Sequence, residues 1–193
     1  MKKKSNKKLF MISISIIFII LLAIIFFPTP SQDKVKIETS KGNIIIELNS
    51  EAAPITVKNF KSYIGENFYD NTVFHRVING FMIQGGGFIE TGQQKQTHNA
   101  IILESNNGLS NEKYTIAMAR TNIPNSATSQ FFINTKDNTF LDYTSTNPGY
   151  AVFGKVIQGF EIVDEIEKAQ TTTKNGMTDW PVEDIIIQKV ELI

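Results

Sequence analysis

The sequence has no cysteine, one tryptophan and two histidines among its 193 residues. Without cysteine it can form no disulfide, no thiolate metal site and no thiol nucleophile, and it cannot be an acylated lipoprotein. The two histidines, His75 and His98, are too few for the usual zinc sites, so we expect no metal. The absence of cysteine leaves the redox compartment open.

Acidic residues are also absent from the start of the chain, where none precedes Asp33. Five of the 19 basic residues are lysines within residues 2–8, which leaves 14 basic against 19 acidic residues elsewhere, a net charge of −5. Nucleic-acid binding requires a basic surface, so we expect no such partner. A content of 41% hydrophobic and 20% charged residues is typical of a globular domain, and the length suits one domain.

Residues 9–27 contain no charged side chain. As a helix they would span roughly 28 Å, close to the ~30 Å of a bilayer core. A cleaved signal peptide has a shorter apolar region of about 7–15 residues and a small-residue cleavage site, and no Ala-x-Ala follows here. We therefore favour an uncleaved anchor at 9–27 over a cleaved signal. Residues 1–8 would be a basic cytoplasmic stub, residues 28–33 a short linker, and residues 34–193 a domain on the other side of the membrane.

A β-hairpin is predicted around the turn-forming pair Asn79-Gly80, which separates two β-rich segments within residues 72–83. The first segment carries one arginine, Arg76, among apolar neighbours. The second carries an aromatic ring, a thioether and an amide: Phe81, Met82 and Gln84. These side chains are consistent with an apolar pocket that holds one fixed donor. The residues alone leave open the alternative of a surface salt bridge at Arg76.

Two more strands are predicted at residues 114–119 and 129–134, joined by a polar loop that contains Pro124. Alternation along the second strand places Gln130 and Phe132 on one face, and Phe131 and Ile133 on the other. By the same alternation His75 points away from Arg76, which favours a hydrogen-bonded core histidine over a catalytic base.

The remaining segments complete a mainly β chain. We expect a hairpin over residues 35–48, helices at 54–64 and about 160–169, and a last strand within 184–193. Residues 91–99 and 170–181, the latter with Trp180, are expected to be polar loops. Many short strands with two distant helices indicate an antiparallel barrel or sandwich.

Two motifs connect the chain to a known family. Residues 74–86, Phe-His-Arg-Val-Ile-Asn-Gly-Phe-Met-Ile-Gln-Gly-Gly, resemble the signature of cyclophilin-type peptidyl-prolyl cis-trans isomerases. Residues 118–122 and 126–134, Met-Ala-Arg-Thr-Asn and Ser-Ala-Thr-Ser-Gln-Phe-Phe-Ile-Asn, resemble the second signature of bacterial members. The resemblance extends over residues 34–193 and implies a closed eight-stranded antiparallel β-barrel with a helix over each open end.

The resemblance also implies the site. Arg76, Phe81 and Gln84 would be catalytic, with Arg76 bonded to the prolyl nitrogen and Gln84 bonded to the substrate backbone while helping to orient Arg76. The substrate would be bound by Met82, Ala119, Arg120, Gln130, Phe132, Phe140, Leu141 and Tyr150. Phe140 replaces a tryptophan and Tyr150 a histidine found in many members. We therefore expect proline binding to persist and the drug cyclosporin to bind weakly.

The implied activity is rotation of X–Pro bonds, which breaks no bond and therefore needs no nucleophile, metal or cofactor. Expected partners are proline-containing unfolded or flexible polypeptides and the lipid bilayer, and we expect a monomer. The anchor is similar to that of bacterial exported members, which suggests the cytoplasmic membrane, with the domain on its extracytoplasmic side assisting the folding of exported proteins. The alternatives are a tethered, non-catalytic proline-binding or chaperone module and a structural membrane scaffold.

Overall fold

The structure, a computed structural model, describes residues 33–193, which form one compact unit. The predicted stub, anchor and nearly all of the linker lie outside the described residues. Within residues 33–193 no helix is both long and apolar enough to span a membrane. The strands and helices are β1 (Lys34–Thr39), β2 (Gly42–Leu48), α2 (Pro54–Gly65), β3 (Thr72–Val73), β4 (Arg76–Ile78), β5 (Met82–Gly85), β6 (Thr115–Met118), β7 (Phe131–Asn134), β8 (Val152–Gln158), α3 (Phe160–Glu167), β9 (Thr171–Lys174), β10 (Met177–Pro181) and β11 (Ile186–Leu192), with 3₁₀ turns at Pro124–Ser126 and Thr139–Leu141.

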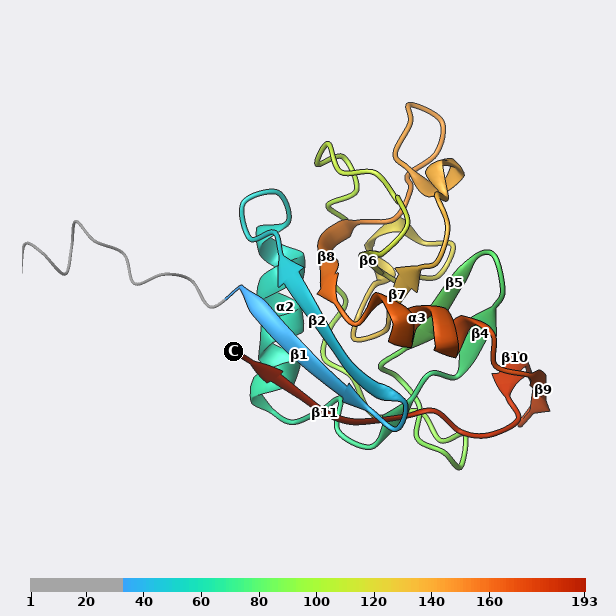
Figure 1. The fold of residues 1–193 in the computed structure, drawn as a ribbon. Coiled ribbons are helices and arrows are strands. Elements are labelled where there is room, and N and C mark those ends of the chain that lie inside the picture. The colour runs from blue at the N-terminus through green and yellow to red at the C-terminus, as the bar shows by residue number, and fades with distance from the viewer. Residues whose placement is uncertain (1–32) are drawn as a thin grey trace, which may run out of the picture. The chain divides into compact units, whose positions relative to one another are not determined.

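Nine strands form a curled antiparallel sheet in the order β3-β11-β1-β2-β8-β6-β7-β5-β4 (Figure 1). The mainly β class with two α-helices is confirmed for the part of the chain described. The expected closure of eight strands into a barrel is wrong. β3 has two residues and pairs with β11, β4 has three residues and pairs with β5, and no ladder joins these two edges.

The first hairpin forms as its alternation predicts. Cross-strand partners Val35↔Ile46 and Ile37↔Ile44 are fully buried, whereas the intervening residues are partly exposed. Gly42 begins β2 with φ +136°, and a Cβ there would lie 2.5 Å from Cδ1 of Ile162 in α3. The turn therefore needs glycine both for its backbone angle and for the close approach of the helix.

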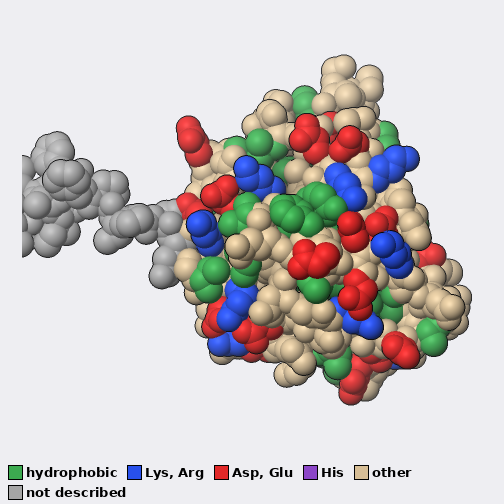
Figure 2. Space-filling view, in the orientation of Figure 1, with side chains coloured by type: hydrophobic (Ala, Val, Ile, Leu, Met, Phe, Trp, Pro, Cys, Tyr) green, Lys and Arg blue, Asp and Glu red, His purple; other side chains and the backbone are tan. Residues whose placement is uncertain are grey.

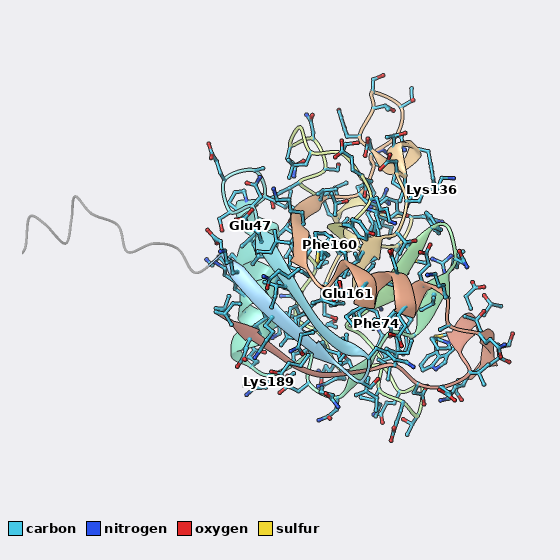
Figure 3. The ribbon with its side chains drawn as sticks, in the orientation of Figure 1. Glu47, Phe74, Lys136, Phe160, Glu161 and Lys189 are labelled. Atoms are coloured by element: carbon cyan, nitrogen blue, oxygen red, sulfur yellow. The ribbon has the colours of Figure 1, made fainter. Side chains whose placement is uncertain are left out.

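Both helices pack into the same core. α2 begins at Pro54, as predicted, and the carboxylate of Glu104 accepts hydrogen bonds from the N–H groups of Ile55 (3.0 Å) and Thr56 (2.7 Å), which otherwise lack partners within the helix. α2 lies against β11, and α3 lies against β2, β4 and β5. α3 starts at Phe160, which is labelled in Figure 3. The Phe160 ring packs edge-on against Tyr114, with ring centres 4.8 Å apart.

The strands around the site separate two hydrophobic clusters. Phe131 and Ile133 of β7 belong to the main core, together with both helices. Phe132, between them, belongs to a smaller cluster with Met82, Ala117 and Val152, which we call the pocket cluster. The predicted alternation of β7 is confirmed, and it directs successive side chains to different clusters.

The expectation of a polar loop at residues 170–181 is wrong. Lys174-Asn175-Gly176-Met177 forms the turn of a two-stranded hairpin, β9–β10, in which Asn175 and Gly176 both have positive φ. Trp180 is fully buried, and its Nε1–H donates to Oδ1 of Asp184 at 2.7 Å. The hairpin lies beside β4 (Figure 1).

Candidate active site

The β4–β5 hairpin positions most of the predicted catalytic residues. Its register pairs Arg76 with Gln84, so both side chains leave the same face of the hairpin. Gly80 occupies the turn with φ +68°. Beyond the turn, the carbonyl of Phe81 accepts hydrogen bonds from Thr135 N (3.1 Å) and Asn138 Nδ2 (2.7 Å). These bonds fix the backbone of Phe81 against the neighbouring loop.

A cavity of about 130 Å³ opens beside this hairpin. Met82 and Phe132 form its apolar floor, with 2% and 4% of their surfaces exposed. The side chain of Arg76 is 40% exposed and contributes a charged donor to the wall. The full lining consists of Arg76, Phe81, Met82, Gln84, Ala119, Arg120, Phe132, Leu141 and Tyr150. The structure thus brings together nine of the eleven residues predicted for the site.

Arg120 and Tyr150 form one wall of the cavity. The guanidinium of Arg120 lies over the Tyr150 ring at 4.4 Å, and its Nε–H donates to the carbonyl of Gly149 at 2.9 Å. The Tyr150 ring also meets Phe132 edge-on at 5.6 Å. Tyr150 N donates to the carbonyl of Leu141 at 2.9 Å, which ties two lining residues together. The Arg120 guanidinium thus interacts with the Gly149 carbonyl and the Tyr150 ring of the protein itself.

Gln130 and Phe140 lie outside the lining. The Gln84 amide donates to Oε1 of Gln130 at 2.9 Å, so Gln130 supports a wall residue from behind. In residues 33–193 no hydrogen bond joins Gln84 to Arg76, so the expected orienting contact is not present. Phe140 is 65% exposed and stacks on Phe81 at 5.8 Å, which places it at the rim.

Two features of the site were missed from the sequence. One is Asp179 of β10, whose Oδ2 lies 3.7 Å from Nε of Arg76. The Asn175-Gly176 pair was the signal that could have revealed its hairpin. The other is a buried amide network in which Asn138 bridges Asn134 Oδ1 (2.8 Å) and the Phe81 carbonyl. Amides scattered between strands carry no sequence signal for such a network.

His75 lies away from the cavity, as its alternation predicts. It is 4% exposed, its ring packs near Phe88 (4.6 Å) and Trp180 (6.0 Å), and Nδ1 has no hydrogen-bond partner in the described part of the chain. Burial lowers the pKa of His75 to about 4, so the ring is neutral at neutral pH. It is a core histidine, as expected, with one ring nitrogen, Nδ1, that has no partner within residues 33–193.

A larger cleft of about 570 Å³ lies elsewhere on the domain. Its lining includes Glu47, Glu112 and Lys155 but no arginine and no aromatic ring. Charged walls suit an apolar ring poorly, because the charges would lose hydration when the ring binds. The smaller cavity, with its apolar floor and the Arg76 guanidinium on its wall, is the better candidate. On the face shown in Figure 2, acidic and basic side chains are interspersed rather than segregated.

The arrangement suits one kind of ligand. The floor accepts a compact apolar ring, and the volume is below the ~300–1,000 Å³ of pockets for drug-sized molecules. Arg76 offers N–H donors to an atom at the edge of that ring. No described group of histidine, cysteine, aspartate or glutamate is arranged to hold a metal ion.

Comparisons with known proteins agree with this geometry. Residues 34–192 match the family model described as cyclophilin type peptidyl-prolyl cis-trans isomerase/CLD. The chain is 51% identical over 162 residues to peptidyl-prolyl cis-trans isomerase cyp18 of Streptomyces antibioticus, which covers 82% of this chain and 98% of the relative. It is 51% identical over 160 residues to peptidyl-prolyl cis-trans isomerase B of Escherichia coli, covering 81% of this chain and 97% of the relative.

Among solved structures, the chain is similar to a cyclophilin type peptidyl-prolyl cis-trans isomerase of Cryptosporidium parvum, crystallised in the presence of the dipeptide Ala-Pro. The TM-score is 0.69 at 29% identity, and the match covers 83% of this chain and 98% of that one.

Proposed function

The chain belongs to the cyclophilin-type peptidyl-prolyl cis-trans isomerases and is an enzyme of that class; we propose that it acts by donating a hydrogen bond from Arg76 to the prolyl nitrogen while the apolar cavity holds the ring. The observation that carries this proposal is the placement of the Arg76 guanidinium, which donates no hydrogen bond within residues 33–193, on the wall of a small cavity with an apolar floor. The Ala-Pro dipeptide of the Cryptosporidium relative supports a proline-containing substrate here too.

The chemistry requires only that the twisted amide be stabilised. An X–Pro bond prefers trans by ~0.5–1 kcal/mol, but rotation must cross a barrier of ~18–20 kcal/mol that comes from amide resonance. As resonance is lost, the prolyl nitrogen gains a lone pair and becomes an acceptor. A donor at that nitrogen binds the transition state more tightly than the planar ground state, which is the condition for catalysis.

Arg76 supplies part of the acceleration. A hydrogen bond from a charged group contributes ~1.5–3 kcal/mol, which corresponds to about a ten- to hundredfold change in rate. The remainder would come from holding the ring on Met82 and Phe132 in an apolar site while the preceding carbonyl rotates. Gln84, on the Arg76 side of the cavity, would bond the substrate backbone.

We further propose that the substrates are exported polypeptides. The support is in the sequence: a stretch of 19 uncharged residues follows five lysines, which favours a single span with the lysines in the cytoplasm. The isomerase domain would then act outside the cytoplasmic membrane, where slow X–Pro steps limit the folding of newly exported chains.

The test is the cis-to-trans rate of a short Ala-Pro-Phe peptide, measured with the full chain in mild detergent. We expect Arg76→Ala to lower kcat/KM about ten- to hundredfold with an unchanged circular dichroism spectrum. Lys58→Ala, on the outer face of α2, is the matched control for loss of a positive charge and should leave kcat/KM unchanged. Full activity of Arg76→Ala would refute the arginine mechanism, and a folded wild type that binds proline peptides without acceleration would support the binding-module alternative.

Localisation needs a separate experiment. Protease added to intact cells or spheroplasts should degrade the isomerase domain while the protein remains in the membrane fraction. Protection of the domain until the membrane is lysed would refute the proposed orientation.

A further inference from the structure

The dipeptides His75-Arg76 and Asp179-Trp180 make two contacts with each other, one buried and one exposed. In the interior, the rings of His75 and Trp180 are 6.0 Å apart. Toward solvent, Asp179 Oδ2 lies 3.7 Å from Arg76 Nε, with about two-fifths of each side chain exposed. His75 directly precedes Arg76 and Trp180 directly follows Asp179, so the buried contact between the rings brings the two exposed charges close together.

Asp179 lies in a stretch of β10 that has one residue more than the facing stretch of β9. Met177 pairs with Lys174 and Trp180 with Thr172, so two residues of β10 face one residue of β9. This two-against-one count defines a β-bulge, a feature that redirects a side chain and often lies next to active sites. Asp179 also has φ +62°, a left-handed conformation that is unusual for a residue other than glycine. The bulge directs the carboxylate toward β4.

The hairpin that carries Asp179 is firmly attached. Besides its buried ring, Trp180 donates a 2.7 Å hydrogen bond to Asp184, and Lys174 forms an ion pair of 2.7 Å with the same carboxylate. Lys174 Nζ also lies 5.3 Å from the centre of the Trp180 ring. These contacts connect both strands of the hairpin to the segment before β11, so the bulge is held on a rigid support.

Within residues 33–193, Asp179 is the only ionic partner of Arg76. The contact uses Nε, the inner nitrogen of the guanidinium. In residues 33–193 the two terminal nitrogens, which carry four of its five N–H groups, form no hydrogen bond with a protein group. At 3.7 Å the contact is an ion pair rather than a hydrogen bond, and the carboxylate attracts the Nε side of the guanidinium, which favours orientations in which the terminal N–H groups point elsewhere.

We propose that Asp179 is a positioning residue for the isomerase reaction, which holds Arg76 by Nε so that its terminal N–H groups face the cavity. This proposal rests on the proposed role of Arg76. Asp179 does not line the cavity. Its effect should therefore be on the rotation step rather than on binding of the proline ring.

The variant Asp179→Asn removes the charge and keeps a residue that tolerates the left-handed conformation. We expect kcat for the Ala-Pro-Phe peptide to fall about three- to tenfold with little change in KM, as for loss of an interaction that acts only in the transition state. Glu183→Gln is the matched control, because Glu183 is an exposed acid of the following segment that forms no ion pair in the described structure. It should match the wild type.

Two further readouts separate positioning from a general structural effect. In NMR spectra of the full chain in detergent micelles, the Nε–H signal of Arg76, identified by its loss in Arg76→Lys, should shift in Asp179→Asn and not in Glu183→Gln. In an Arg76→Ala background, Asp179→Asn should cause no further loss of kcat, because the two residues act as a unit.

The outcomes distinguish this proposal from the one on which it rests. If Arg76→Ala lowers activity about ten- to hundredfold while Asp179→Asn keeps wild-type kcat or leaves the Nε–H signal unmoved, Asp179 is not a positioning residue and the arginine mechanism stands. If the two substitutions lower kcat additively, Asp179 acts independently of Arg76. If Arg76→Ala retains full activity, both proposals are wrong.

Discussion

The carboxylate of Glu167, the last residue of α3, accepts a 2.7 Å hydrogen bond from the backbone N–H of Gly80, at the turn of the β4–β5 hairpin. The two residues are 87 positions apart in sequence, and Glu167 is 9% exposed. The helix α3, which is distant in sequence, thus holds the turn of the hairpin that carries Arg76, Phe81 and Gln84.

Removal of this contact should loosen the hairpin. We expect Glu167→Ala to lower the free energy of unfolding by about 1–2 kcal/mol, and kcat/KM several-fold, because the hairpin carries the catalytic side chains. Urea unfolding followed by the fluorescence of Trp180, the only tryptophan, measures the first effect. The control is Glu165→Ala on the same helix, where an exposed 3.5 Å ion pair with Lys41 should contribute little. Equal effects of the two substitutions would contradict this role of Glu167.

Phe131 and Phe132 offer a matched pair on one strand. Phe131 is fully buried in the main core, so Phe131→Ala should cost about 3–5 kcal/mol of stability by leaving a closed cavity. Phe132→Ala opens into the site cavity instead and should cost less, about 2 kcal/mol, while kcat/KM falls at least about tenfold. Unfolding curves and peptide kinetics on both variants check this. A Phe132→Ala enzyme with normal activity would argue against its place in the proline pocket.

Tyr150 should contribute mainly to binding. Tyr150→Leu removes the ring beneath Arg120 and beside Phe132, and we expect KM to rise about three- to tenfold with kcat little changed, as for loss of uniform binding. Tyr150→Phe keeps the ring and should behave like the wild type. If the phenylalanine variant is as impaired as the leucine variant, the hydroxyl rather than the ring is what matters.

His75 should make the domain sensitive to acid. Its folded pKa, lowered to about 4 by burial, is below the ~6.5 of an exposed histidine, so protons bind the unfolded chain more readily. The contribution of the neutral ring to stability is complete above pH 6.5 and falls as the pH drops toward 4, by about 3 kcal/mol. Thermal unfolding of the wild type and of His75→Gln between pH 7.5 and 4.5 measures this. The wild type should lose more stability than the variant, and parallel pH profiles would disprove the assignment.

Much of the fold was predictable because local patterns and packing agree. The alternation of β1, β2 and β7 and the helical spacing of Val57 and Phe60 reflect burial that the structure shows. Four of the nine lining residues were placed by one long signature that spans both strands of the hairpin bearing Arg76. The other five were placed by the second signature and by the segments that follow it.

The predictions that were wrong concern features that depend on contacts between segments distant in sequence. Barrel closure would require a ladder between β3 and β4, which alternation cannot predict for strands of two and three residues. The β9 segment Thr171–Lys174 has no apolar alternation, so its strand rests on the Asn175-Gly176 turn and on burial of Trp180. Asp179 reaches Arg76 only through the bulge, and a bulge has no signal in an exposed polar stretch.

Arg76 also lies on an edge strand of the nine-stranded sheet, since β4 forms a ladder with β5 alone, although β10 packs beside it. Exposed edges can template pairing between molecules, and proteins counter this with short edge strands and charged side chains. β4 has three residues and its one charge is the arginine. The side chain assigned to catalysis is therefore also a charge of the kind that disfavours pairing at a sheet edge. An arginine at this position thus has a structural explanation besides catalysis, and its presence alone is not proof of activity.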